Sequence, residues 1–398
     1  MRGNFSGALR ILPDALASTA YARCIDTEPT ISPPLLTEPR DLVVGLSRLR
    51  DLNPVGVDVE RADWDRYWRK AALIQIGGAG RSALVDPIEA PDLTPLDEFL
   101  GERTVVLHAM ENDLVPLAAA GVNPPRVDDT AVAAALLGYP TGLETLLEDV
   151  LGITLDIDKQ AMQRADWEAR PLEAGMLAYA AADVTDLPEL WGALRDRLEE
   201  TGRLAWYEEE IVALRAQPPV EERRSWSRLK GVGRLDPEGQ GRARALWQAR
   251  ERLGRETDTA PGRIVTDKAL VKLAEEPPSG TRDLGRRGLR RQAVREFGDV
   301  LIDALRTAGP APARQRERRV READRDLAEQ LRDIRAGHAN DLGLDPGVLC
   351  PSRILLSAVV TDPPTPEDLR SALGMRRWQW EIVGGAFCEA LGLADPGE

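Results

Sequence analysis

Short apolar runs in the first part of the chain have the length and composition of β-strands. They occupy residues 55–59, 72–76, 83–85 and 104–107 and are separated by polar or glycine-containing segments. Apolar residues at helical spacing then follow at 130–138, 143–151 and 172–200. Three strands followed by alternating strands and helices predict a mixed β-sheet flanked by helices.

Proline- and glycine-rich segments divide the rest of the chain. Residues 217–219 and 309–312 have the composition of linkers. The pattern after each linker is helical, with turns expected at 231–233, 276–280, 345–347 and 363–364 and a charged helix at about 316–337. We therefore expect an N-terminal arm at 1–40, an α/β domain at 41–210, an all-helical domain at 220–306 and a second helical domain at 316–395.

The two helical domains share one short pattern. A proline turn followed by Arg-Ile occurs as Pro261-Gly262-Arg263-Ile264 and again as Pro351-Ser352-Arg353-Ile354. We interpret the second helical domain as a degenerate copy of the first, with these two segments in register.

Composition narrows the class of protein. With 398 residues, of which 43% are hydrophobic, the chain can form two or three domains with cores of their own. Three widely spaced cysteines and two histidines argue against a zinc site and favour a reducing compartment. The sequence shows neither a membrane-spanning apolar run nor a signal peptide, so we expect a cytoplasmic protein. Because no coiled-coil heptad run is evident, we expect a monomer.

The charge is unevenly distributed. The net charge is −14, yet residues 223–306 contain 20 Lys+Arg against 12 Asp+Glu, a local charge of +8. Only five of the 52 basic residues are lysine, which GC-rich codon usage could also produce. The first helical domain is therefore a candidate polyanion binder inside an acidic protein.

The most informative stretch is 166–184, DWEARPLEAGMLAYAAADV. It predicts a turn and then a helix with Pro171 in its first turn. Tyr179 and Asp183 are four residues apart and so share one face of that helix. A phenol one turn from a carboxylate suits a site that holds a metal and orients a water. The alternative is two surface residues.

Two further stretches place carboxylates at the ends of apolar strands. Asp58 and Glu60 lie two residues apart on the first strand, so both face the same side of the sheet. Burying them is costly unless they bind cations or reach solvent. Asp113 begins a helix after the strand at 104–107. Its alternative role is that of a helix-start acid favoured by the macrodipole.

Together these stretches resemble a known family. The order D-x-E, then H-A-x-x-x-D, then Y-x-x-x-D is similar to the DEDD-type 3′→5′ exonucleases, and the string D-W-x-x-R-P-L before the tyrosine narrows the resemblance to ribonuclease D. Leu73-Ile74-Gln75 and Val127-Asp128-Asp129-Thr130 also match family positions. The resemblance covers about residues 40–205. Residues 220–306 resemble an HRDC (helicase and ribonuclease D C-terminal) domain, and 330–392 resemble a second copy more loosely.

The resemblance implies a fold, a cofactor and a set of catalytic residues. The fold would be ribonuclease H-like, followed by HRDC helical bundles. Two divalent cations, Mg²⁺ or Mn²⁺, would be held ~3.5–4 Å apart by carboxylates and would activate a water and stabilise the leaving 3′ oxygen. The carboxylates would be Asp58, Glu60, Asp113 and Asp183, and Tyr179 would orient the water.

Substrate contacts are expected at the metal site and in the helical domain. His108 could contact RNA or make a structural hydrogen bond, and Lys159 could approach the scissile phosphate or lie in a solvated loop. Arg66, Trp68 and Arg69 interleave cations with an aromatic ring, which suits a single strand, although Trp68 could instead be core. Two arginine pairs at helical spacing would share one face and grip phosphates, unless that face is merely solvated; they are Arg286, Arg287, Arg290 and Arg291.

The resemblance therefore predicts a metal-dependent 3′→5′ exoribonuclease. It would trim RNA 3′ ends, such as those of tRNA precursors, and release nucleoside 5′-monophosphates. The alternatives are a 3′→5′ DNA exonuclease and a non-catalytic nucleic-acid-binding adaptor on the same fold. The chain lacks the helicase motif G-x-x-x-x-G-K-[ST] and retains all five catalytic positions, which argues against these two alternatives respectively.

Overall fold

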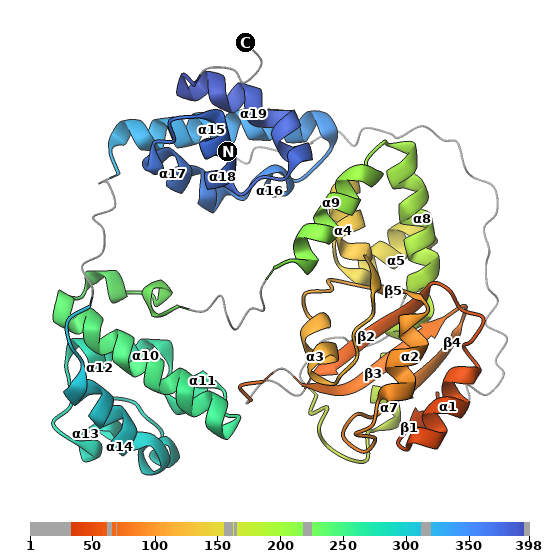
Figure 1. The fold of residues 1–398 in the computed structure, drawn as a ribbon, viewed down its shortest axis with the longest axis horizontal. Helices are drawn as coiled ribbons and strands as arrows, with labels where there is room; N and C mark the ends of the chain where they lie inside the picture. The colour runs from red at the N-terminus through yellow and green to blue at the C-terminus, as the bar shows by residue number, and fades with distance from the viewer. Residues whose placement is uncertain are drawn as a thin grey trace, which may run out of the picture. The chain divides into compact units, whose positions relative to one another are not determined.

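The computed structural model describes residues 33–61, 66–68, 70–154, 162, 165–217, 225–311 and 320–393. Lys159 and Arg69 lie outside these residues. No helix in the described ranges is both long and apolar enough to cross a membrane. The described residues form an α/β domain and two helical domains (Figure 1).

The α/β domain is built on a mixed six-stranded sheet, as the sequence predicts. Its strands are β1 (Leu35–Leu36), β2 (Val55–Arg61), β3 (Ala71–Gly78), β4 (Arg81–Val85), β5 (Thr104–Leu107) and β6 (Arg126–Asp129), in the order β1-β4-β3-β2-β5-β6. β3 pairs antiparallel with both β2 and β4, whereas β5 and β6 continue the sheet in parallel with β2. The four predicted strands are confirmed, and β1 and β6 are additions to the expected set.

Helices cover both faces of the sheet (Figure 1). They are α1 (Pro39–Ser47), α2 (Thr94–Gly101), α3 (Leu114–Ala119), α4 (Thr130–Leu137), α5 (Leu143–Leu151), α7 (Ala174–Thr185), α8 (Leu187–Glu200) and α9 (Leu204–Arg215). The single helical pattern at 172–200 is split into α7 and α8 at Asp186. Because α7 begins at Ala174, the placement of Pro171 in its first turn is wrong.

The two faces of the sheet bury separate cores. Leu73 and Leu84 face α7 and pack with Met176 and Ala180 of that helix. The alternate positions, such as Val57, point to the other face and join the larger core of the domain. This alternation follows from the two-residue period of a strand, and it places Asp58 and Glu60 on the α7 side.

The first helical domain contains two 3₁₀ turns and five helices. Its elements are η1 (Trp226–Arg228), η2 (Val232–Arg234), α10 (Pro237–Thr257), α11 (Pro261–Ile264), α12 (Asp267–Glu275), α13 (Thr281–Arg286) and α14 (Arg291–Thr307). The second domain repeats the five helices as α15 (Glu322–Leu342), α16 (Pro346–Leu349), α17 (Ser352–Thr361), α18 (Pro366–Leu373) and α19 (Arg377–Leu391). The degenerate copy is therefore present, with one long helix, one short helix and three further helices in each domain.

A buried arginine fixes the register of this repeat. In the long helix α10, Arg250 donates to the carbonyl of Val265, which caps the short α11. In the long helix α15, Arg335 donates in the same way to the carbonyl of Cys350, which caps α16. The counterpart of Pro261 is therefore Pro346, because each opens a short helix. The predicted pairing with 351–354 is wrong, since that segment begins the next helix.

The second helical domain is anchored to α9. Trp206 of α9 stacks on Trp378 of α19 with 4.8 Å between ring centroids. Glu209 accepts hydrogen bonds from the backbone amides of Arg377 and Trp378, and so satisfies the first turn of α19. The apolar cores of the two domains are continuous at this contact.

Candidate active site

β2 and the C-terminal end of α7 meet on one face of the sheet. A Cβ atom at Gly56 would lie 2.6 Å from the carbonyl oxygen of Val184, so glycine is what lets the helix approach the strand this closely. The approach brings Asp183 beside the carboxylates of β2. One oxygen from each of Asp58, Glu60 and Asp183 lies within 4.8 Å of the others.

Asp113 supplies a fourth carboxylate next to this group of three. It is the N-cap residue of α3, where an acid is favoured by the macrodipole, but its side chain makes no capping hydrogen bond. The residue is 3% exposed, and its Oδ2 atom is buried without a hydrogen-bond partner. Burial and the nearby charges of Asp58 and Glu60 raise the pKa of Asp113. Its oxygens do not belong to the three-residue group whose oxygens lie within 4.8 Å of one another.

The four carboxylates repel one another. Burial, followed by the charges of Asp58 and Asp183, raises the pKa of Glu60 to about 8. Crowded carboxylates of this kind are stabilised in their ionised form by a multivalent cation. The clustered oxygens and the unpartnered Oδ2 of Asp113 therefore fit a divalent cation, which takes hard oxygen ligands.

Gln75 lies beside the cluster and was not among the predicted site residues. It pairs with Asp58 across β2 and β3, so both side chains share a face of the sheet. Gln75 is fully buried, and neither its amide nitrogen nor its amide oxygen has a hydrogen-bond partner in the protein. An orphaned amide at this position is a further sign that the site holds polar groups other than side chains.

Tyr179 reaches the cluster from α7. Its hydroxyl is hydrogen-bonded to Asp183, and burial together with the neighbouring carboxylates raises its pKa, so it stays protonated. Its ring packs in the α7 core, with its centroid 6.3 Å from that of Trp167. The hydroxyl therefore faces the carboxylates while the ring anchors it.

The turn before α7 is fixed by a buried ion pair. Arg170 bonds both carboxylate oxygens of Asp86, with Nε–Oδ2 and Nη2–Oδ1 distances of 2.5 and 2.8 Å. Asp86 is fully buried directly after β4, and Arg170 also donates to the carbonyl of Ala72 in β3. The D-W-x-x-R-P-L string thus ties the start of α7 to two strands and helps to set the position of Asp183.

Other predicted contacts have structural partners. The Nδ1 atom of His108 lies 2.9 Å from Oγ1 of Thr130. This agrees with the alternative role of His108, a structural hydrogen bond. Trp68 is 44% exposed, which excludes its core role. Its neighbour Tyr67 is buried instead, and the Tyr67 hydroxyl donates to Glu251 of α10. Arg66 bonds Glu168 at 2.8 Å, and Asp258 lies 3.7 Å from it.

The prediction of one helical face for the four arginines is wrong. Arg286 ends α13 and Arg291 begins α14, and a turn separates the two helices. Gly288 in this turn has φ +102, a left-handed conformation that breaks the helix. Arg287 bonds Glu276 within the domain, whereas Arg290 lines a pocket described below.

Comparisons with known proteins agree with this architecture. A family model described as 3′-5′ exonuclease matches residues 36–199, and the HRDC domain model matches twice, at 239–305 and 324–391. The solved structure of Escherichia coli RNase D, described as an exoribonuclease involved in structured RNA processing, is similar with a TM-score of 0.74. At 23% identity it covers 90% of this chain and 98% of its own, which supports the fold.

Curated relatives carry the family assignment. Ribonuclease D of Pseudomonas paraeruginosa is 31% identical over 350 residues, covering 85% of this chain and 92% of its own. Ribonuclease D of Granulibacter bethesdensis is 33% identical, covering 71% of this chain and 73% of its own. The chain belongs to the ribonuclease D family of 3′→5′ exoribonucleases.

Proposed function

We propose that this protein removes nucleoside 5′-monophosphates from RNA 3′ ends at the cluster formed by Asp58, Glu60, Asp113 and Asp183, with two divalent cations bound. The observation that carries the proposal is the convergence of carboxylates from β2, α3 and α7, one of them with a buried unpartnered oxygen. Mg²⁺ and Mn²⁺ both accept such a set of oxygen ligands.

The bound cations would supply Lewis acidity at the scissile phosphate and a lowered pKa for the attacking water. The carboxylates of the chain would hold that charge in place, and the cations would stabilise the carboxylates in their ionised form. The protonated hydroxyl of Tyr179 donates to Asp183, so its oxygen can accept a hydrogen bond from the water and orient it. The water gives up a proton to solvent as its oxygen bonds to phosphorus, the bond from phosphorus to the 3′ oxygen breaks, and the 3′ oxygen takes up a proton from solvent.

A pocket beside the loop after β2 offers a place for the RNA backbone. It has a volume of about 410 Å³, and three arginines line it together with two carboxylates: Arg66 of that loop, and Arg263, Arg290, Asp258 and Glu296 of the first HRDC domain. Trp68 of the same loop is exposed, so a base can stack on it. We propose that these groups hold nucleotides upstream of the cleaved end, as backbone contacts without sequence selection.

The finer assignments rest on this picture. We propose structured RNAs such as tRNA precursors as substrates, because the E. coli structure is described as an exoribonuclease of structured RNA processing. Reaction in the cytoplasm by a monomer is part of the same proposal. Cys350 is a buried free thiol, which agrees with a reducing compartment.

Digestion of matched RNA and DNA strands tests the proposal. Each strand carries a 5′ label and is incubated with Mg²⁺, with Mn²⁺ or with chelator. We expect stepwise shortening of RNA from the 3′ end in the presence of either cation only, and none with Asp58→Asn, which should still bind RNA. Asp149→Asn, an exposed carboxylate on α5, is the matched control. Shortening by Asp58→Asn or in chelator would refute the mechanism, and faster digestion of DNA would refute the substrate class.

A further inference from the structure

The position of Asp113 is set by the backbone turn that precedes it. Oδ2 of Asp113 has no hydrogen-bond partner, and its side chain does not cap α3. The backbone amide of Asp113, in contrast, donates to the carbonyl of Met110 at 3.1 Å, and the amide of Leu114 donates to the same oxygen at 3.0 Å. Whatever holds Met110 therefore holds the carboxylate.

That turn is in a conformation that needs support. Ala109 has φ +63, in the left-handed region that side chains other than glycine rarely adopt. Its carbonyl accepts from the amide of Asn112, which closes the turn after β5. A left-handed alanine persists only where the surrounding structure fixes it.

One buried carboxylate fixes it. The two oxygens of Asp129 accept from the amides of Ala109 at 3.1 Å and Met110 at 2.7 Å. Its Oδ1 also accepts from the amides of Ala131 and Val132, capping α4. Asp129 is 1% exposed, so these four bonds are made away from water, where such charge-assisted bonds are strong.

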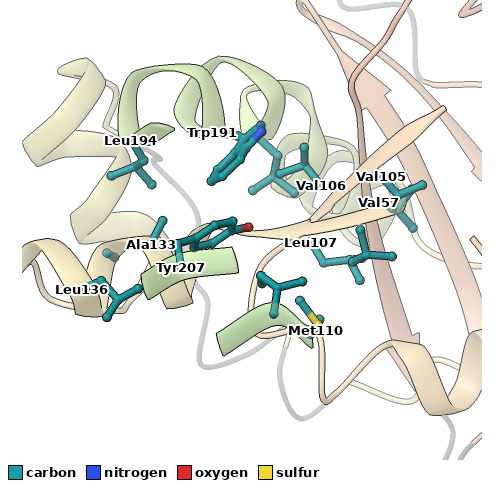
Figure 2. Close-up of a cluster of buried hydrophobic side chains, with 14 of the residues drawn as sticks. Val57, Val105, Val106, Leu107, Met110, Ala133, Leu136, Trp191, Leu194 and Tyr207 are labelled. Atoms are coloured by element: carbon teal, nitrogen blue, oxygen red, sulfur yellow. The ribbon is translucent and has the colours of Figure 1, made fainter. Parts of the chain in front are cut away.

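Neighbouring residues hold Asp129 itself in place. Its backbone amide donates to the hydroxyl of Tyr207 at 2.7 Å, and that hydroxyl donates to Asp128. Figure 2 shows the ring of Tyr207 beside Trp191 in the core of the domain, with 4.8 Å between the ring centroids. The next residue, Thr130, donates to the carbonyl of Leu107, so the turn is attached at both of its ends.

We propose that Asp129 is a positioning residue: its carboxylate holds the turn at Ala109 and Met110 in the conformation that presents Asp113 to the cations. The inference rests on the proposed function, because it takes Asp113 as a cation ligand. A residue that only capped α4 would affect stability without affecting cation binding. Groups that orient metal ligands in this way change metal affinity by 10–100-fold when they are replaced.

Titration of Mn²⁺ into the full chain tests this role by calorimetry, without reference to activity. Asp129→Asn keeps an oxygen that can cap α4 but places an NH₂ group where Met110 needs an acceptor. We expect the affinity for the more weakly bound of the two Mn²⁺ ions to fall by 10–100-fold in Asp129→Asn. Asp236→Asn, at the cap of α10 in the HRDC domain, is the matched control and should bind Mn²⁺ as the wild type does.

A double-mutant cycle separates positioning from stability. If Asp129 acts through Asp113, adding Asp129→Asn to Asp113→Ala should cause no further loss of Mn²⁺ affinity, because coupled residues are not additive. Full additivity, or wild-type affinity in Asp129→Asn, would overturn the inference. Absence of Mn²⁺ binding by the wild type would instead overturn the proposed function.

Hydrogen exchange provides a test that does not require a folded variant. In the wild-type protein, we expect the amides of Ala109 and Met110 to exchange at least 100-fold more slowly than the exposed amide of Gly142. Exchange of the two turn amides at the rate of Gly142 would show that Asp129 does not hold them, and would overturn the positioning role.

Discussion

Replacing Glu60 with glutamine should make the metal-free protein more stable and the enzyme inactive. Burial and the charges of Asp58 and Asp183 raise the pKa of Glu60 from 4.5 to about 8. Folding therefore takes up a proton at this side chain between these two pH values. Its contribution to stability is fully present below pH 4.5 and is lost as the pH rises through about 8.

The size of the effect follows from the separation of the two pKa values. Each unit corresponds to about 1.4 kcal/mol, so a shift from 4.5 to about 8 sets a ceiling of about 5 kcal/mol at alkaline pH. The repulsion is shared with Asp58 and Asp183, which can relax, so we expect about half of this ceiling. For a domain of this size, 1 kcal/mol changes Tm by about 2–4 °C, which gives a rise of about 5–10 °C.

Thermal unfolding in chelator at pH 5 and pH 8.5 measures this difference. We expect Glu60→Gln to exceed the wild type in Tm at pH 8.5, and the two proteins to converge at pH 5. Added Mn²⁺ should stabilise the wild type and have little effect on the variant. Glu148→Gln, an exposed residue of α5, is the control and should match the wild type throughout. A Glu60→Gln protein that is no more stable at pH 8.5 would refute the electrostatic reasoning.

Three further variants test other parts of the structure. Tyr179→Phe should lower kcat about 10²-fold or more while KM for RNA stays within about twofold, since the hydroxyl acts on the water; an equal change in KM would contradict that role. The double variant Arg263→Gln/Arg290→Gln should flatten the slope of log RNA affinity against log salt concentration by about 1.4, whereas replacing the exposed Arg306 with glutamine should leave the slope unchanged. An unchanged slope in the double variant would argue against RNA binding in the pocket. Arg250→Met should cost about 2–4 kcal/mol in urea unfolding, because it removes the hydrogen bond to the Val265 carbonyl and the ion pair with Glu251. A loss below about 1 kcal/mol would contradict the capping role of Arg250.

Much of the fold could be predicted from local pattern. The four strands predicted from the sequence are apolar runs bounded by turns, and the carboxylates at their ends follow directly. β6 could not be found in this way, because its sequence is Arg-Val-Asp-Asp and it is a strand only through pairing with β5. A two-residue strand such as β1 carries even less local signal. It was therefore not predicted, and part of the sheet lies within residues 1–40, which were expected to be an arm.

The errors arose where spacing alone could not decide. The arginine pairs at 286–287 and 290–291 fit one helix by spacing, but Gly288 breaks it and the buried Leu289 turns the chain into the core. The repeat register failed for a similar reason, because Arg-Ile after a proline lies in the short helix α11 of the first domain but in α17, the helix after the short one, in the second. The buried Arg250 and Arg335, which fix that register, are recognised only by their partners in space.

The carboxylates of the candidate site were predictable from the sequence, but the residues that hold them in position were not. The resemblance identified the four carboxylates and Tyr179, whereas Asp129 and Gln75 were only family positions without a role. Their contribution depends on contacts between distant segments: Asp129 lies 20 residues from Ala109 in sequence, and Gln75 faces Asp58 only through strand pairing. Such long-range contacts leave no periodic signal in the chain.

The most direct measurement of the central claim is an anomalous difference map from crystals grown with Mn²⁺ and a nucleoside 5′-monophosphate. The account predicts two Mn²⁺ peaks enclosed by Asp58, Glu60, Asp113 and Asp183, with the hydroxyl of Tyr179 facing the phosphate. Peaks located elsewhere, or no peak within reach of these four carboxylates at millimolar Mn²⁺, would contradict it.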